Sequence, residues 1–101
     1  MSILHLTLKR EWFDLIASGK KKVEYREIKP YWETRFLEGG KFFAINYKTI
    51  PKKFKYIIFK NGYSKRSPRM KVECKRLRLM EYEGRLHFAW ILGRVLWVKN
   101  R

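Results

Sequence analysis

Residues 19–26 read GKKKVEYR, and this stretch joins the end of an expected helix to the start of an expected strand. The glycine permits the left-handed backbone conformation that commonly ends a helix. Residues two apart in a strand share a face, so Glu24 and Arg26 point the same way, and Lys21 can lean over the same spot. An acid flanked by two cations suits binding of a polar or anionic ligand. A surface ion-pair cluster of little energetic value is the alternative.

The segments around this stretch follow clear hydrophobic periods. In residues 3–9 the leucines at positions 4, 6 and 8 alternate with Ile3, His5 and Thr7, which predicts a strand with one face on the core. Residues 10–18 form an expected short helix that ends at Gly19. Its apolar stripe consists of Trp12, Phe13, Leu15 and Ile16. Residues 23–29 are expected to be a strand, with Glu24 and Arg26 on one face and Val23 and Tyr25 on the other.

The middle of the chain is divided by proline and glycine. Pro30 suits the first turn of a second helix, which is expected to run to about residue 38 and to stop at Gly39 and Gly40. Residues 41–47 are expected to be a strand or an extended loop. Residues 55–60 are expected to form a strand that the turn pair Asn61-Gly62 ends. Residues 63–69 are polar and basic, which predicts a mobile loop.

Two long strands are expected to complete the chain. Residues 70–82 alternate, but the parity slips near Lys75 and Arg76, which predicts a bulge or a bend. Residues 88–99 are expected to be a last strand with a kink at Gly93. Strands therefore dominate, after two short helices near the N-terminus. We expect one domain over residues 1–101, of the α+β class, with about five or six mostly antiparallel strands.

The charge of the chain is high and unevenly distributed. Its 25 Lys and Arg residues face 9 Asp and Glu residues, for a formal net charge of +16. Between Lys48 and Arg78 there are twelve basic residues and one acid, Glu73. Charges of one sign at this density repel one another, so we expect a polyanionic partner. RNA or another single-stranded nucleic acid fits better than a membrane, because no expected helix has a basic face opposite a broad apolar one.

Other site classes find little support in the sequence. Cys74 is the only cysteine, so no intrachain disulfide forms, and we expect a buried, inert thiol. His5 and His87 lie in no recognisable catalytic pairing, and no cluster of metal ligands or cofactor motif is present. The N-terminus is unlike a signal peptide and no apolar run approaches the ~20 residues that span a bilayer. We therefore expect a cytoplasmic protein with no cofactor.

The motif Gly19-x-Lys21-x-x-Glu24-x-Arg26 resembles the signature of ASCH domains, a branch of the PUA-like superfamily. The segment from Leu6 through the helix to Gly19 is similar to the opening of such domains. The runs at residues 29–32 (KPYW) and 59–63 (FKNGY) resemble a small bacterial and phage subgroup. The likeness covers most of the chain and is weakest over residues 40–53. It implies a small, closed or nearly closed PUA-like β-barrel.

The resemblance also implies a cleft bordered by the first helix and neighbouring strands, where ASCH domains are proposed to hold RNA or a modified nucleobase. We predict that the cleft floor is formed by Lys21, Glu24 and Arg26. Arginine can pair with phosphate or a base edge, tyrosine and tryptophan can stack on a base, and asparagine can read an amide-like edge. The other predicted nucleic-acid-binding residues are Lys29, Tyr31, Trp32, Asn61, Tyr63, Lys65, Arg66 and Arg69.

Two other functions stay open at this point. Some members of the wider family are enzymes, either ribonucleases or hydrolases of N4-acetylcytidine. The hydrolase uses a threonine where this chain has Glu24, which puts that chemistry in doubt. Lys21 would be a base only if neighbouring cations favoured its neutral form, whereas an ion pair with Glu24 would keep it charged. The third function is a phage or host protein-interaction module. Trp32 and Tyr63 can also be packing residues with no ligand.

Overall fold

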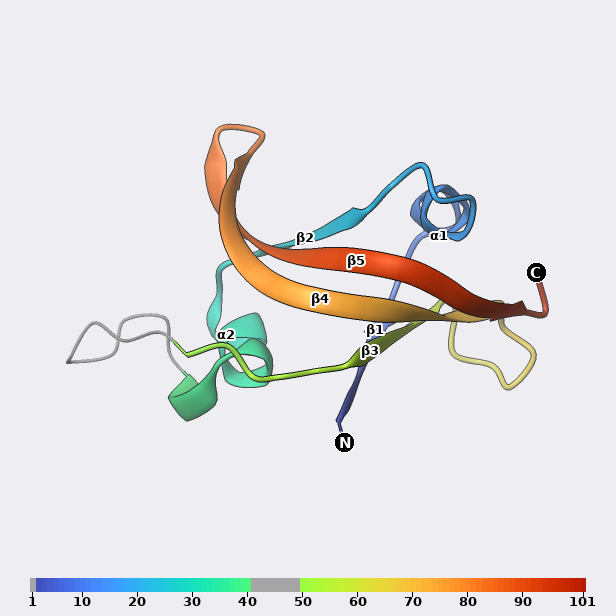
Figure 1. Ribbon diagram of the computed structural model, residues 1–101, viewed down its shortest axis with the longest axis horizontal. Coiled ribbons are helices and arrows are strands. Elements are labelled where there is room, and N and C mark those ends of the chain that lie inside the picture. The colour runs from blue at the N-terminus through green and yellow to red at the C-terminus, as the bar shows by residue number, and fades with distance from the viewer. Residues whose placement is uncertain (1, 41–49) are drawn as a thin grey trace.

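In the computed structural model, residues 2–40 and 50–101 are described, and they form five strands and two short helices (Figure 1). The elements in chain order are β1 (Ile3–Thr7), α1 (Arg10–Ala17), β2 (Val23–Glu27), α2 (Pro30–Phe36), the 3-10 turn η1 (Glu38–Gly40), β3 (Tyr56–Lys60), β4 (Arg69–Tyr82) and β5 (Arg85–Lys99). The α+β class, the two early helices and the strand positions are confirmed. The strand or loop expected at residues 41–47 lies outside the described residues.

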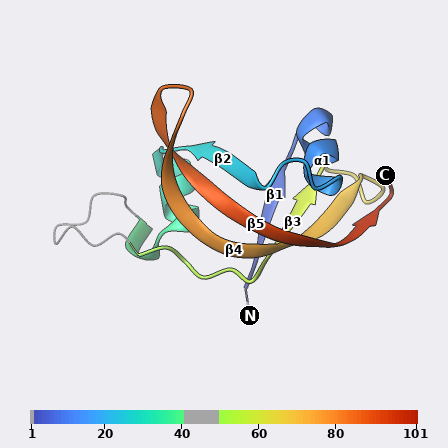
Figure 2. The same cartoon turned by 45° about the horizontal axis from the view of Figure 1, so that its top comes forward.

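The five strands make one open, mixed sheet in the order β1-β3-β4-β5-β2. The β1–β3 pair is parallel and the other three pairs are antiparallel, so the expected antiparallel majority is confirmed. The closed barrel is not confirmed, because the edge strands β1 and β2 do not pair with each other. The long strands β4 and β5 curve together through the molecule, and α1 and α2 lie near opposite ends of this ribbon (Figures 1 and 2).

The curvature follows from bulges between β4 and β5. The register shifts between Lys71 and Val72, between Val72 and Cys74, and between Cys74 and Arg76. Glu73 lies opposite the two residues Gly93 and Arg94, since the flanking pairs are Val72–Val95 and Cys74–Leu92. Bulges increase the local twist, so one end of this ribbon pairs with β3 while the other end pairs with β2. The bulge expected near Lys75 is confirmed, and Gly93 lies at a second one.

The core fills the inner face of the curved sheet. Alternate residues of each strand point inward, and both helices add apolar side chains to the same cluster. Helix α1 contributes Phe13 and Ile16, three residues apart on one face, and α2 contributes Phe36. The main strand residues of the core are Leu4, Leu6, Leu8, Ile57, Phe59, Met70, Val72, Phe88, Trp90 and Leu92. Trp12, expected in the buried stripe, is instead 37% exposed, because its side of α1 faces away from this cluster.

Helix boundaries differ slightly from the expected ones. Helix α1 ends at Ala17, and Gly19 then adopts a φ of 80°. The amides of Lys20 and Lys21 both donate to the Leu15 carbonyl oxygen at 3.0 Å, which completes the helix end. Helix α2 ends at Phe36 rather than residue 38, because Leu37 is extended, with φ −118° and ψ 140°, and forms a bridge with Pro51.

Cys74 provides a test of the packing of β4 against the core. Its side chain is buried, and burial raises the pKa of the thiol from 9.0 to about 11. The thiolate is the reactive form, so at pH 8 its population should be roughly 100-fold below that of an exposed thiol. We expect iodoacetamide to alkylate the native protein at least about 100-fold more slowly than the urea-unfolded protein. Equal rates in the two states would contradict this packing.

Candidate functional site

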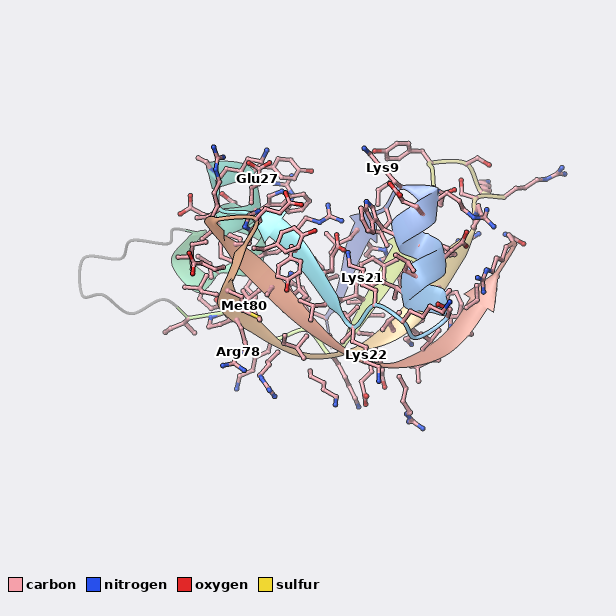
Figure 3. The ribbon with its side chains drawn as sticks, turned by 90° about the horizontal axis from the view of Figure 1, so that it is seen from above. Lys9, Lys21, Lys22, Glu27, Arg78 and Met80 are labelled. Carbon is pink, nitrogen blue, oxygen red and sulfur yellow. The ribbon has the colours of Figure 1, made fainter. Side chains whose placement is uncertain are left out.

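The sequence-predicted cluster of one acid and two cations forms on the inner face of the sheet. Glu24 of β2 pairs with Trp90 of β5, and Arg26 pairs with Phe88, so both side chains share the face that carries the core. Lys21 reaches the same place from the turn that Gly19 permits. Figure 3 shows Lys21 between β2 and α1. The prediction that these three side chains converge is therefore confirmed.

Glu24 is buried, and each of its carboxylate oxygens forms an ion pair with one of the two cations. The Nζ of Lys21 donates to Glu24 Oε1 at 2.9 Å, and the Nε of Arg26 donates to Glu24 Oε2 at 2.9 Å. A second guanidinium nitrogen, Nη2, lies 2.8 Å from the same Oε2. The side chain of Glu24 is only 6% exposed, against 21% for Lys21 and 16% for Arg26. A carboxylate at this depth needs such partners, so the reading as a loose surface cluster does not hold.

Arg26 also connects the two edges of the open sheet. Its Nη2 donates a hydrogen bond of 3.0 Å to the carbonyl oxygen of Thr7, the last residue of β1. Strand β2 is thus joined to β1 by a side chain where the backbones do not pair. The described contacts engage Nε and Nη2 of Arg26, which leaves Nη1 for a ligand.

Two tryptophans flank the cluster. The Nζ of Lys21 lies 4.7 Å from the ring centroid of Trp12, and the Cζ of Arg26 lies 4.9 Å from that of Trp32. Both distances allow cation–π attraction. Trp32 also stacks on Phe36 at 5.1 Å, so it packs α2 onto the core and contacts Arg26 at the same time.

Beside Arg26 there is a pocket of about 550 Å³, which we call the edge-strand pocket because β1 forms one wall. Helix α2 supplies the opposite wall, and the loop after β3 adds one aromatic side chain. The lining residues are His5, Leu6, Thr7, Leu8, Lys9, Arg26, Tyr31, Trp32, Arg35 and Tyr63. In the described part of the chain, this lining holds three cations, three large aromatic rings and no carboxylate.

Four of the residues predicted from the sequence line this pocket: Arg26, Tyr31, Trp32 and Tyr63. Tyr31 is 54% exposed and Tyr63 is 91% exposed, so both rings are available to a ligand. Arg35 was not predicted, yet its Cζ lies 3.5 Å from the centroid of the Tyr31 ring. Its position four residues after Tyr31 in a helix is the signal that could have identified it. Lys9, at the N-terminus of α1, was also missed.

The other predicted residues lie elsewhere or have structural roles. The side-chain amide of Asn61 donates to the Leu8 carbonyl oxygen at 2.9 Å, so it tethers β1 to the loop after β3. Lys29 is exposed and lies 3.6 Å from Glu27. Lys65 and Arg66 are exposed in the loop between β3 and β4. Arg69 lies at the start of β4, where its Nη2 donates to the Lys65 carbonyl oxygen at 2.7 Å.

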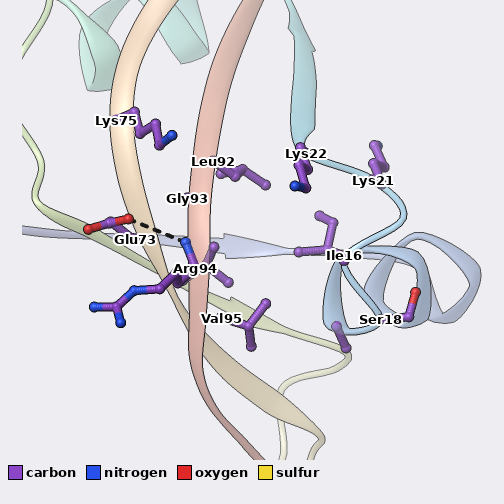
Figure 4. A pocket seen from close by; sticks show the side chains of 13 residues that line it. Ile16, Ser18, Lys21, Lys22, Glu73, Lys75, Leu92, Gly93, Arg94 and Val95 are labelled. Atoms are coloured by element: carbon purple, nitrogen blue, oxygen red, sulfur yellow. Dashed lines mark hydrogen bonds between the residues drawn. The ribbon is translucent and has the colours of Figure 1, made fainter.

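A second pocket, of about 500 Å³, lies between the end of α1 and the β4–β5 ribbon (Figure 4). Lys21 and Lys22 border it on the α1 side, and Lys75 and Arg94 border it on the sheet side. Glu73 is part of the same lining, and its Oε1 accepts a hydrogen bond of 3.3 Å from the Arg94 amide. This pocket was not predicted from the sequence, because a bulge brings its sheet residues together.

In a comparison with known families, the profile of the ASCH domain matches residues 6–85. The matched range contains the ion-pair cluster and all residues of the edge-strand pocket except His5. No curated protein and no solved structure matches the chain. Within the described residues, no helix is long and apolar enough to cross a membrane.

The contribution of the ion-pair cluster to stability can be tested by replacing two glutamates of β2, one inside the cluster and one outside it. Glu24→Gln leaves two partly buried cations without a carboxylate, so we expect the free energy of unfolding to fall by about 3 kcal/mol or more. Glu27→Gln, on the same strand, removes an exposed carboxylate and should cost less than about 1 kcal/mol. Urea denaturation of both variants measures these losses. Equal losses would contradict a buried role for Glu24.

Proposed function

This chain belongs to the ASCH domain family, and from this premise we propose that it binds single-stranded RNA in the edge-strand pocket. The observation that carries the proposal is the composition of the pocket lining in the described residues, with three cations, three large aromatic rings and no carboxylate. Cations neutralise phosphates, and aromatic rings accept unpaired bases whatever their sequence. A lining of this kind favours a strand of unpaired nucleotides over a neutral ligand.

Each part of the lining has a separate role in this proposal. Tyr31 and Tyr63 stack on bases, because their rings are the most exposed of the pocket. Lys9 and Arg35 contact phosphates at the two sides of the pocket. Arg26 donates from Nη1 to a phosphate or to a base edge at the floor. Lys65 and Arg66 follow Tyr63 in the loop and extend the phosphate contacts beyond the pocket.

Glu24 is a positioning residue in this proposal. Both of its oxygens are engaged, one by Lys21 and the other by Arg26, so it holds the guanidinium in place rather than meeting the ligand. We do not extend the proposal to catalysis. The ion pair ties the amine of Lys21 to the carboxylate of Glu24, so neither group is presented as a free base.

A modified nucleoside is a second candidate ligand for the same pocket. The volume of about 550 Å³ falls within the range of about 300–1,000 Å³ that is typical of small-molecule sites. A free nucleoside has no phosphate, so its affinity should change little with salt concentration. Titration with nucleosides and with RNA at two ionic strengths separates the two candidates.

RNA affinity should depend steeply on salt. If roughly five to eight phosphates are engaged, the log–log slope of the association constant against salt should be about −3.5 to −5.6 for single strands. Fluorescence anisotropy of a labelled single-stranded RNA over a series of salt concentrations measures this slope. A slope near zero would contradict the proposal, as would equally tight binding by an unrelated fold of the same net charge.

Tyr31→Ala should weaken RNA binding without unfolding the protein, because the ring is 54% exposed. The loss of one stacked base is worth about 1–3 kcal/mol, which corresponds to about fivefold to 150-fold in affinity. The matched control is Tyr82→Ala, which removes a partly exposed ring that stacks on Tyr25 and does not line the pocket. The same anisotropy assay should find the control unchanged, and equal losses in both variants would show that the pocket is not the binding site.

A further inference from the structure

The face of the sheet opposite the core carries a second set of aromatic and basic side chains. Paired residues in neighbouring strands point to the same side, so the pairs Tyr56–Glu73, Lys60–Arg69, Lys71–Trp97 and Arg69–Lys99 define one face. The core residues Ile57, Phe59 and Met70 alternate with these and point inward. We call this the outer sheet face, defined by Tyr56, Lys60, Arg69, Lys71, Trp97 and Lys99.

The rings and cations of the outer sheet face are interleaved. The Nζ of Lys71 lies 4.3 Å from the ring centroid of Tyr56, and the Nζ of Lys99 lies 4.8 Å from that of Trp97. Lys55 adds a further ammonium 5.6 Å from the Tyr56 ring. An exposed cation–π contact is weaker than the stacking of a base on an aromatic ring. A base can therefore replace the ammonium at either ring, and the freed lysine can then meet a phosphate.

The one acid that the described residues place on this face is Glu73, and the backbone of β5 engages it. The carboxylate of Glu73 accepts a hydrogen bond from the Arg94 amide and lies over Gly93, where a side-chain Cβ would collide with it (Figure 4). The bulge therefore gives Glu73 a backbone partner on β5. Arg69, unlike Glu73, adds a positive charge to this face. Within the described residues its Nε is buried and has no hydrogen-bond partner, although its Nη2 is bonded.

The outer sheet face is continuous with the edge-strand pocket. His5 and Thr7 line that pocket from β1, and they pair with Ile58 and Lys60 of β3. A chain that leaves the pocket over β1 thus meets β3 next, followed by β4 and β5. At about 4.8 Å between strands, these four strands make a platform about 14 Å wide.

We propose that a single-stranded RNA continues from the edge-strand pocket across β1 onto the outer sheet face, where bases stack on Tyr56 and Trp97 and phosphates contact Lys60, Lys71 and Lys99. This inference rests on the proposed function and names a second surface for it. Four-stranded sheets with exposed aromatic rings bind unpaired bases in this way. Charge complementarity identifies the partner, because in the described part of the chain the cations of this face outnumber its one carboxylate, which is itself hydrogen-bonded. The dense basic run between residues 48 and 78 supplies three of these cations: Lys60, Arg69 and Lys71.

The test compares two double variants that each remove two positive charges. Lys71→Gln with Lys99→Gln changes the outer sheet face, and Arg78→Gln with Arg85→Gln changes two exposed residues elsewhere on the ribbon. Figure 3 shows Arg78 pointing away from Lys21 and β2. The probes are oligouridines of about four and about twelve nucleotides, within the range of known single-strand site sizes. Each is titrated by anisotropy over a series of salt concentrations.

The outer-face variant should bind the long RNA with a log–log salt slope shallower by about 1.4, which corresponds to two lost phosphate contacts. It should bind the short RNA as the wild type does, because the pocket alone accommodates that probe. The control double variant should retain the wild-type slope for both probes. Tyr56→Ala should weaken binding of the long RNA about fivefold or more, and Tyr56→Phe should restore it.

The results that would refute this inference differ from those that would refute the pocket proposal. If Tyr31→Ala weakens both RNAs while the outer-face variant matches the control, RNA binds in the pocket and the outer-face path is refuted. If the wild type binds neither RNA, both proposals are overturned. Crosslinking with 4-thiouridine RNA gives an independent readout that does not depend on stability. Peptides that contain Tyr56 or Trp97 should carry the crosslink, and their absence beside crosslinked pocket peptides would also refute the path.

Discussion

One buried carboxylate links the fold of this chain to its candidate site. Glu24 binds Lys21 with one oxygen and Arg26 with the other, and Arg26 also reaches the Thr7 carbonyl oxygen across the open edge of the sheet. Edge strands expose unpaired backbone groups, and here a guanidinium satisfies one of them. Arg26 is therefore fixed from both sides where it lines the edge-strand pocket. The contact that joins the two sheet edges therefore also orients the site.

The bulges of the β4–β5 ribbon explain how so small a chain can present two surfaces. Without them, strands of 14 and 15 residues would form a long, gently twisted hairpin. The bulges at Glu73 and Lys75 bend the ribbon so that its inner face encloses the apolar core, while Lys71 and Trp97 on its outer face are half-buried. The basic residues between Lys48 and Arg78 are thereby divided. Most of these basic residues that belong to strands lie on the outer side of the sheet. The edge-strand pocket takes its cations from other parts of the chain.

The sequence predicts the elements better than their assembly. Period-two alternation and Gly19 were enough to place the strands, α1 and the convergence of Lys21, Glu24 and Arg26, because these depend on local geometry. Sheet order depends on contacts far apart in sequence, and the resemblance to barrels suggested a closure that the edge strands do not make. Lys9 was missed for the same reason, since only the approach of α2 to β1 brings it into the pocket. Arg35 could have been identified from its helical spacing to Tyr31. Asn61, a predicted ligand contact, donates its side-chain amide to the Leu8 carbonyl oxygen, a tether that no local pattern indicates.

A two-dimensional NMR titration tests most directly whether RNA binds in the edge-strand pocket. It follows the arginine Nε–H and tyrosine ring signals while single-stranded RNA is added. The Nε–H of Arg26 and the ring of Tyr31 should shift together, in proportion to the bound fraction, while the signals of Arg78 and Tyr82 at the far end of the ribbon stay in place. Shifts confined to the far end, with Arg26 and Tyr31 unchanged at saturation, would contradict the assignment of the edge-strand pocket as the binding site.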